Sequence, residues 1–320
     1  MRLSIIIPVY QVKHTLARCL DSIVKQSFRD WQAILVDDGS TDGSSSICDT
    51  YAEHDPRIQV IHLKRNKGLS AARNAGIDKA KAEYITFIDS DDFIADDTLK
   101  MLMETLAVHP DYDMIEYAVL EYFGSKHPHR LQFFTKEYTD MTEYWLQCKA
   151  YRHTYVWNKI YRRELFNCVR FPVGMTFEDC LTMPLILKNC RRIATTGAGL
   201  YYYCENKNGI TRRATAADLS CMLLAHVRTI NNIEKELDKT GTQQKWNNDM
   251  AAYYAHVLNI QFDVYDKSGC FFVNSRKGNK VHTHYRFPIL PYRNTFKLKL
   301  LHLIGIKCLC SLHRIIRHLS

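Results

Sequence analysis

The sequence predicts an α/β fold in which a mixed, mostly parallel sheet is flanked by helices, followed by a helical C-terminal region. Three observations lead to this prediction. Short apolar runs alternate with stretches of helical spacing through the first 90 residues, a pattern typical of βαβ units. Acidic residues directly follow two of these runs, at 37–38 and 89–92, where open α/β sheets bind ligands. From about residue 216, two long helical patterns replace the alternation.

The first half of the chain begins with a strand over 3–9, which is apolar apart from Ser4 and contains Pro8. Apolar residues at every third or fourth position predict each helix, uninterrupted apolar runs predict each buried strand, and a cluster of Gly, Ser, Thr and Asp predicts the turn. The elements that follow are a helix over 14–27, a strand over 31–36, a turn over 37–43, a helix ending near 54, a strand over 58–63, a helix over 69–81 and a strand over 83–88.

The second half is less regular. Its predicted elements are a helix from 97 to 109, a strand over 112–122, a polar loop over 124–136, a helical or irregular stretch over 140–166, a helix over 178–189, a strand over 193–204 and two helices within 216–265. Little periodicity is visible over 269–295. We expect one large domain over 1–215, with halves at about 1–110 and 111–215, and an accessory region over 216–320.

The composition, with 46% hydrophobic and 24% charged residues, is that of a globular protein. No apolar run reaches the roughly 18 residues that a transmembrane helix needs. The chain enters its first strand at once, so we expect no signal peptide. The 11 scattered cysteines include no C-x-x-C pair, which favours free thiols in a reducing cytoplasm over a disulfide framework or a zinc site.

The positive net charge belongs to the C-terminal tail. Residues 267–320 hold 11 of the 43 Lys and Arg residues and no acid, so the remainder sums to 32 minus 34, or −2. Within the tail, 298–319 has the spacing of a basic amphipathic helix. Its predicted apolar face holds Leu301, Ile304, Cys308, Leu312, Ile315 and Leu319, whereas Leu303 and Ile306 interrupt the polar face. This helix either lies on an anionic membrane surface or packs on the protein's own core.

Three motifs carry chemistry. The strand that ends at Ile88 runs into Asp89, Asp91 and Asp92, and crowded carboxylates at a buried edge favour a hard divalent cation. Asp37–Asp42 is either a helix-capping turn or part of a ligand site. Asn66–Asn74 opens a helix with a glycine turn beside Lys67, an arrangement that suits a phosphate group as well as a solvated helix start.

Together these motifs resemble a known family. Ser4–Tyr10, Val36–Asp42, Asn66–Asn74 and Asp89–Asp92 are similar, in this order, to the signatures of family 2 glycosyltransferases with the GT-A fold. The resemblance is strong over about 3–110 and continues more weakly through Trp157–Lys159, Phe177–Asp179 and Gly209–Thr211. The chain departs from the family pattern at Gln11, where Asn is usual, and at Asn208–Gly209, where a Ser commonly precedes Ile-Thr.

The resemblance implies a nucleotide-sugar donor site with Mg²⁺ or Mn²⁺. Asp91 is the expected metal anchor, with Asp89 beside it, and Asp38 resembles the acid that binds the nucleotide base. Because a uracil ring N–H pairs well with a carboxylate, a UDP-sugar is the expected donor. The other candidates are Pro8 and Tyr10 at the nucleoside, Arg73 at the diphosphate or ribose, and Lys67, Asn74 and Trp157 as further contacts. We expect Tyr201–Tyr203 to form a core strand, since alternating side chains do not all face one site.

The acceptor hydroxyl must lose a proton as it attacks from the face opposite the leaving group. Asp179 resembles the family's catalytic base, with Glu178 as the competing assignment. Alternatively, Thr176 and both acids merely favour the start of the helix over 178–189.

The expected protein is thus an inverting hexosyl- or N-acetylhexosaminyl-transferase of cell-surface polysaccharide synthesis. Its acceptor would be a glycan or lipid-linked glycan, and its location cytoplasmic and peripheral on the inner face of the plasma membrane; no nucleic-acid partner is expected. A nucleotidyltransferase is one alternative, but it would normally carry glycines after the first strand, where the chain has Pro8–Gln11. A non-catalytic scaffold with the same fold is another, and the intact acids argue against it.

Overall fold

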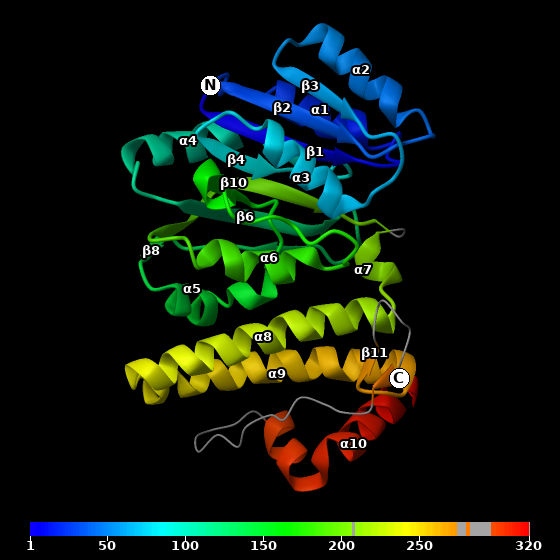
Figure 1. The fold of residues 1–320 in the computed structure, drawn as a ribbon, viewed down its shortest axis with the longest axis vertical. Helices are drawn as coiled ribbons and strands as arrows, with labels where there is room; N and C mark the ends of the chain where they lie inside the picture. Colours follow the sequence, from blue (N-terminus) through cyan, green and yellow to red (C-terminus); the bar gives the residue numbers. More distant parts are fainter. Residues whose placement is uncertain (207–208, 274–279, 282–295, 320) are drawn as a thin grey trace. The chain divides into compact units, whose positions relative to one another are not determined.

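The structure, a computed structural model, describes all residues except 207–208, 274–279, 282–295 and 320. The chain forms two compact units (Figure 1). The first comprises residues 1–141, 155–174 and 185–207, and the second comprises residues 142–154, 175–184 and 208–320.

Within the described residues, ten strands form one mixed sheet in the first unit. The central order is β3 (Ile58–His62), β2 (Trp31–Asp37), β1 (Leu3–Val9), β4 (Tyr84–Phe87), β9 (Lys159–Arg162), β6 (Met114–Phe123), β10 (Ile193–Cys204) and β5 (Phe93–Ile94), while β7 (His129–Leu131) pairs with β6 and β8 (Lys136–Tyr138) with β10. The strands β3, β2, β1 and β4 are parallel, as are β6 and β10. The predicted mixed, mostly parallel sheet is confirmed.

Burial explains why the N-terminal strands read as continuous apolar runs. All seven residues of β1 and of β2 are buried, as expected of parallel strands covered on both faces. The helices of this unit are α1 (Leu16–Val24), α2 (Ser44–His54), α3 (Leu69–Lys79), α4 (Thr98–Val108) and the 3-10 turn Arg163–Phe166. The helix α3 packs tightly on β1, because a Cβ at Gly76 would lie 2.4 Å from Ile6 Cγ2.

Four short strands of this sheet, β5, β7, β8 and β9, were not predicted, and β7 lies inside the stretch 124–136 that was predicted to be a polar loop. β5 follows the acidic cluster directly, and β9 lies inside the stretch predicted as helical or irregular. The polar residues of β9 hide its character, since Lys159 is fully buried in the sheet and pairs with Glu116 of β6 at 2.7 Å. A charged residue in a central strand defeats a pattern based on hydrophobicity.

The second unit is mainly helical. Its elements are α5 (Met141–Gln147), the 3-10 turn Ala150–Arg152, α6 (Glu178–Leu187), α7 (Ile210–Arg213), α8 (Ala216–Thr240), α9 (Gln243–Ser268), β11 (Phe272–Val273), β12 (Lys280–Val281) and α10 (Phe296–Leu319); Met141 and the last three residues of α6 are assigned to the first unit. The helices α8 and α9 lie side by side (Figure 1). A reciprocal pair of hydrogen bonds between Thr215 and Asp218 caps the start of α8.

The tail helix α10 is broken at Gly305, where φ is 75° and ψ is 162°. Its packed side chains are Leu298, Leu301, Ile306, Leu309 and Cys310. His313 stacks on Phe262 of α9, and Arg317 pairs with Asp263 at 2.6 Å. The prediction of one continuous apolar face is therefore wrong, because the break changes which side chains face α9. None of the helices in the described ranges is long and apolar enough to cross a membrane.

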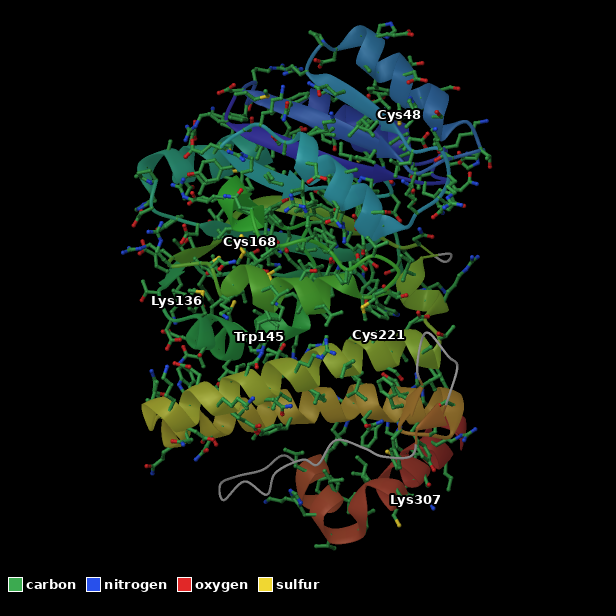
Figure 2. The ribbon with its side chains drawn as sticks, in the orientation of Figure 1. Cys48, Lys136, Trp145, Cys168, Cys221 and Lys307 are labelled. Atoms are coloured by element: carbon green, nitrogen blue, oxygen red, sulfur yellow. The ribbon has the colours of Figure 1, made fainter. Side chains whose placement is uncertain are left out.

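All 11 cysteines lie in the described ranges, and each is a free thiol. Figure 2 labels three of them: Cys48 on α2, Cys221 on α8 (Ala216–Thr240) and Cys168 in the segment that follows the 3-10 turn Arg163–Phe166. Most of the others are buried, where they pack as small apolar side chains.

Candidate active site

The acidic cluster forms a turn directly after β4. Asp89 Oδ1 accepts a hydrogen bond from Arg73 Nη2 at 3.0 Å, and this Arg73, on α3, is only 1% exposed. The guanidinium also lies over the ring of Phe171, 5.4 Å from its centroid. The structure thus brings together Arg73 and Asp89, which the sequence motifs placed in different elements.

The two acids after Ser90 are more deeply placed. Asn206 Nδ2 donates to Asp91 Oδ2 at 2.7 Å, and Arg18 Nη2 donates to the Asp91 carbonyl oxygen at 2.6 Å. Burial, reinforced by the charge of Asp89, raises the pKa of the Asp91 carboxyl. Asp92 is fully buried, and burial together with the charges of Asp91 and Asp89 raises its pKa well above the usual range. Such crowding is costly without a positive partner.

Strand β10 holds this turn in place. The buried hydroxyl of Tyr201 accepts from the Asp89 backbone N–H at 3.1 Å and donates to Asp92 Oδ2 at 2.9 Å. The backbone N–H of Cys204 donates to Asp92 Oδ1 at 2.7 Å. Tyr201 was correctly predicted in a core strand, but its hydroxyl reaches the site.

Sequence reasoning missed Arg18, Tyr201 and Asn206 as parts of this site, and it named Asp92 in the acidic motif without giving it a role of its own. Arg18 and Asn206 lie outside the motifs, so the sequence held no signal for them. Asp92 belongs to the acidic motif itself, and its adjacency to Asp91 was the available signal.

The end of β2 forms the second part of the site. Both carboxylate oxygens of Asp38 accept backbone N–H groups, from Lys67 and Gly68, each at 2.7 Å. At the adjacent Gly39, φ is +73° and a Cβ would lie 2.8 Å from the Arg65 carbonyl carbon. Glycine is therefore required for the 65–68 loop to approach. The side chain of Lys67 itself is exposed.

Asp37, the neighbour of Asp38, belongs to an ion-paired group. Its Oδ2 lies 3.0 Å from His62 Nδ1, and His62 Nε2 lies 2.9 Å from Asp49 Oδ1. Burial opposes ionisation of Asp37, but hydrogen bonds from Ser40 and His62 outweigh it and lower its pKa. The hydrogen bond to Asp37 in turn raises the pKa of His62. The group anchors the base of the turn that presents Asp38.

The start of α3 has the features of an anion site. Ser70 is buried, and in the part of the chain that the structure describes its Oγ has no hydrogen-bonding partner. Asn74, a predicted donor contact, has both ends of its amide bonded to the Phe171 backbone, at 2.8 and 2.9 Å. This contact gives Asn74 a structural role. Pro8 is buried in β1 opposite Val36, and Tyr10 is exposed just beyond β1.

Trp157 is a packing residue. Its ring stacks on Tyr155 at a centroid distance of 3.9 Å, on Tyr201 at 4.3 Å and on Tyr203 at 5.3 Å, and it is 5% exposed. A sugar would find no free face, so the expected ligand contact is not supported by the structure. The next residue, Asn158, joins the Glu116–Lys159 pair, with its Oδ1 2.8 Å from Lys159 Nζ.

The predicted catalytic base lies in the second unit. Asp179 is partly buried and Glu178 is buried, both in the first turn of α6. The residue before them, Phe177, has φ of +57°, a strained value for a bulky side chain. Thr176 donates to Asp218 Oδ1 at 2.7 Å, which ties the approach to α6 to the start of α8. Both acids also suit the helix dipole, so the structural role stays open.

Known proteins resemble this chain in sequence and in fold. The protein GlyA of Streptococcus pneumoniae, described as a glycosyltransferase, is 31% identical over 66% of this chain and 32% of its own length. The protein EpsJ of Bacillus subtilis, described as an uncharacterized glycosyltransferase, is 36% identical over 65% of this chain and 62% of its own. The chain thus spans about a third to three fifths of these two relatives.

Among solved structures, S. aureus TarS in complex with UDP-GlcNAc is similar, with a TM-score of 0.64 and 24% identity over 83% of this chain and 81% of that one. This likeness concerns the fold. The family model described as Glycosyl transferase family 2 matches residues 4–170, which hold the acidic turn, Asp38 and the start of α3. The chain therefore belongs to glycosyltransferase family 2.

Proposed function

We propose that this protein is an inverting glycosyltransferase that moves a hexosyl or N-acetylhexosaminyl group from a UDP-sugar to a surface glycan or its lipid-linked precursor. The observation that carries the proposal is the acidic turn Asp89–Asp92, held against Arg73 at the same sheet edge as Asp38. The family membership and the UDP-GlcNAc complex of TarS support a nucleotide-sugar donor. The names of the relatives support the transferase class.

The residues of the turn fit a divalent cation. They offer carboxylate oxygens, the ligands that Mg²⁺ and Mn²⁺ prefer. Asp91 is the proposed anchor, and Asp89 keeps 23% of its side chain exposed while paired to Arg73. When bound, the metal would neutralise the diphosphate that leaves the sugar.

The rest of the donor site follows from the loops. Asp38 has lone pairs left beyond its two backbone bonds and would accept the uracil ring N–H. Exposed Tyr10, after Pro8, would cover the nucleoside. The orphan hydroxyl of Ser70 and the exposed Lys67 would bind phosphate oxygens at the N-terminus of α3.

Asp179 is the proposed base that takes the proton of the acceptor hydroxyl. It lies in the first turn of α6, after the strained Phe177. Strain of this kind persists where the surroundings enforce it and is frequent at functional positions. Glu178, which is buried, is the second choice.

The test measures donor affinity and turnover together. Asp91→Asn should abolish transfer and weaken UDP binding in Mn²⁺, whereas Asp111→Asn, in an exposed pair with Arg192, should change neither. Asp179→Asn should keep donor affinity and lose turnover by about 10²-fold or more. Wild-type turnover in Asp91→Asn would refute the metal assignment, and loss in Glu178→Gln alone would exchange the roles of the two α6 acids.

We also propose that the tail contacts the inner face of the plasma membrane. Beyond the side chains packed on α9, α10 leaves Leu312, Ile315 and Ile316 exposed by 41%, 57% and 58%, and the exposed Lys299 and Lys307 lie on the same helix. Apolar side chains among cations suit an anionic lipid surface.

Liposome co-sedimentation tests this contact. Full-length protein should pellet with anionic vesicles, less so at high salt, and the variant Ile315→Asp/Ile316→Asp should stay in the supernatant. The matched variant Glu104→Asp, on the exposed face of α4, should pellet like wild type. If all three proteins sediment equally, the membrane contact lies elsewhere in the chain. If wild type does not sediment, α10 only packs on the protein and does not bind membranes.

A further inference from the structure

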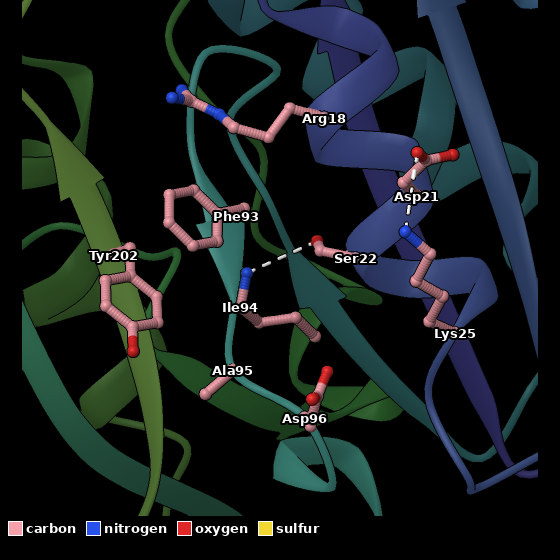
Figure 3. A pocket seen from close by; sticks show the side chains of 9 residues that line it. All are labelled: Arg18, Asp21, Ser22, Lys25, Phe93, Ile94, Ala95, Asp96 and Tyr202. Carbon is pink, nitrogen blue, oxygen red and sulfur yellow. Dashed lines mark hydrogen bonds and ion pairs between the residues drawn. The ribbon is translucent and has the colours of Figure 1, made fainter.

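A groove of about 780 Å³ lies in the first unit, beside the acidic turn, with which it shares Arg18. Its lining residues are Arg18, Asp21, Ser22, Lys25, Phe93, Ile94, Ala95, Asp96 and Tyr202 (Figure 3). The helix α1 forms one wall, β5 and the residues after it form the floor, and Tyr202 of β10 closes the far side. Its volume lies within the range of small-molecule sites. None of the residues proposed above for the donor, the metal or the base lines it.

The groove has an aromatic platform. The rings of Phe93 and Tyr202 are stacked, with centroids 4.4 Å apart and an interplanar angle of 9°. Phe123 meets both rings edge-on, at 5.3 and 5.1 Å, and fixes their orientation. Both residues are partly exposed. Since Tyr202 covers one face of the Phe93 ring and the Arg18 guanidinium lies over the ring as well, the ring surface offered to a ligand is that of Tyr202 together with the edge of Phe93. Flat aromatic surface of this kind suits the C–H face of a sugar ring.

Polar side chains surround the platform with balanced charge. Two cations, Arg18 and Lys25, face two acids, Asp21 and Asp96, so the formal charge of the lining is zero. Lys25 and Asp21 are 3.6 Å apart and both well exposed, which leaves them free to exchange partners. A phosphate or another anion would meet as much repulsion as attraction here. An uncharged ligand rich in hydroxyl groups can both donate to the acids and accept from the cations.

The groove is mechanically joined to the acidic turn. Phe93 follows Asp92 directly in the chain, so its Cα lies within about 7.6 Å of the Asp91 Cα. The guanidinium of Arg18 lies over the Phe93 ring, 4.9 Å from the centroid, while its Nη2 donates to the Asp91 carbonyl oxygen. The floor continues from β5 into the turn at Asp96. A chain of sugars could therefore occupy the groove while one end of it reaches the region of the turn.

We infer that this groove binds an uncharged stretch of the acceptor glycan, behind the sugar that receives the transferred group. This inference rests on the proposed function. The groove would then select acceptors by their length and sugar identity, and it would do so separately from donor binding. A glycan bound there would contact the ring of Tyr202 and the edge of Phe93, and its hydroxyl groups would donate hydrogen bonds to Asp96.

The test uses full-length protein with UDP and Mn²⁺ on an array of neutral oligosaccharides of three or more residues, with phosphorylated counterparts alongside. Wild type should retain at least one neutral glycan. Tyr202→Ala and Asp96→Ala should each weaken that binding by about tenfold, the effect of losing one good stacking or hydrogen-bonding partner. Lys100→Ala, on the exposed face of α4, should bind like wild type. Asp96 is exposed, so its variant tests the groove even if Tyr202→Ala fails to fold.

The outcomes separate this inference from the proposed function, because hydrolysis of the UDP-sugar without acceptor is measured on the same samples. Three results would each overturn the inference about the groove. They are retention of phosphorylated glycans alone, binding by the groove variants equal to that of wild type, and retention of no glycan at all. If the donor is still hydrolysed, the proposed function stands in all three cases. If neither wild type nor any variant binds or hydrolyses a UDP-sugar, the proposed function fails instead.

Discussion

Tyr201→Phe isolates one hydroxyl group that we expect to position the acidic turn. This hydroxyl is buried and bridges the Asp89 backbone N–H and Asp92 Oδ2, at 3.1 and 2.9 Å. The phenyl ring of the variant keeps the stack on Trp157, whose centroid is 4.3 Å away. The substitution therefore removes two hydrogen bonds and leaves the packing in place.

The expected loss of stability follows from the two buried groups that lose the Tyr201 hydroxyl as a partner, which are the Asp89 backbone N–H and the Asp92 carboxyl. A buried polar group that loses its partner costs about 1–3 kcal/mol. Asp92 keeps the Cys204 N–H on its other oxygen, at 2.7 Å, so its loss is partial. The two losses together predict about 2–4 kcal/mol. Movement of the turn will relieve part of this cost, and that movement should weaken Mn²⁺ binding. A loss of about 1.4 kcal/mol in the free energy of Mn²⁺ binding raises the Mn²⁺ concentration for half-maximal activity about tenfold.

Two measurements on one pair of variants check this prediction. Urea unfolding gives the stability loss, and transfer rates against Mn²⁺ concentration give the metal dependence. Tyr117→Phe is the matched control, since Tyr117 is buried in the same sheet and its hydroxyl donates to the Trp157 carbonyl at 3.4 Å, away from the acids. The control should lose stability without a change in metal dependence. If Tyr201→Phe behaves identically to the control, the hydroxyl has no positioning role.

Three further predictions concern the scaffold. Lys159→Met removes the cation that lies 2.7 Å from the buried Glu116 carboxylate, so the free energy of unfolding measured in urea should fall by about 3–5 kcal/mol, and adding Glu116→Leu should recover much of the loss. Gly39→Ala forces a Cβ against Arg65 at positive φ, so calorimetry should show weaker UDP binding; unchanged affinity would show that the loop adapts. Burial lowers the pKa of His226 to about 3, below its unfolded value of 6.5, so the unfolded state binds more protons in acid and stability falls as the pH drops below 6.5. Between pH 7.5 and 5.5, His226 should therefore lower the free energy of unfolding by about 1.4 kcal/mol. In His226→Gln, the free energy of unfolding measured in urea should depend less on pH by that amount. A pH profile identical to that of wild type would exclude a neutral buried histidine.

The N-terminal half was predictable because the residue pattern within each segment is enough to determine whether that segment forms a strand or a helix. Each of β1 to β4 is an apolar run next to a helix of clear period, and the observed bounds differ from the predicted ones by a few residues at most. The failures share one cause, which is that a distant partner changes what a residue contributes. Lys159 reads as a surface residue until Glu116 is placed opposite it. Ile306 was predicted to interrupt a polar face and is buried instead, because Gly305 breaks the helix.

The candidate site divides in the same way. Motif residues such as Asp38 and Asp89 could be identified because short spacing within one loop fixes their neighbourhood. Tyr201 and Asn206 lie more than 100 residues from the acids that they bind, and no local pattern marks a hydroxyl or amide for that purpose. Trp157 shows the opposite error, since an aromatic residue in a motif suggested ligand stacking whereas its faces are covered by Tyr155, Tyr201 and Tyr203.

Long-range assembly of the acidic turn has a consequence for ligand binding. The turn is complete only when β10 has joined the sheet, since Tyr201 and Cys204 of β10 and Asn206 just after it add their hydrogen bonds to those from Arg18 and Arg73. UDP and Mn²⁺ should therefore bind the native state and not the unfolded chain, and stabilise it by about 2.7 kcal/mol at 100 times the dissociation constant.

Urea unfolding with and without UDP and Mn²⁺ measures this stabilisation. Tyr201→Phe should lose part of it, because its turn is less well held before the ligands bind, whereas Tyr117→Phe should keep it in full. Equal stabilisation of both variants and wild type would mean that the turn is ordered without β10. In that case the hydrogen bonds from β10 contribute to fold stability alone, and the metal site depends on β4 and α3.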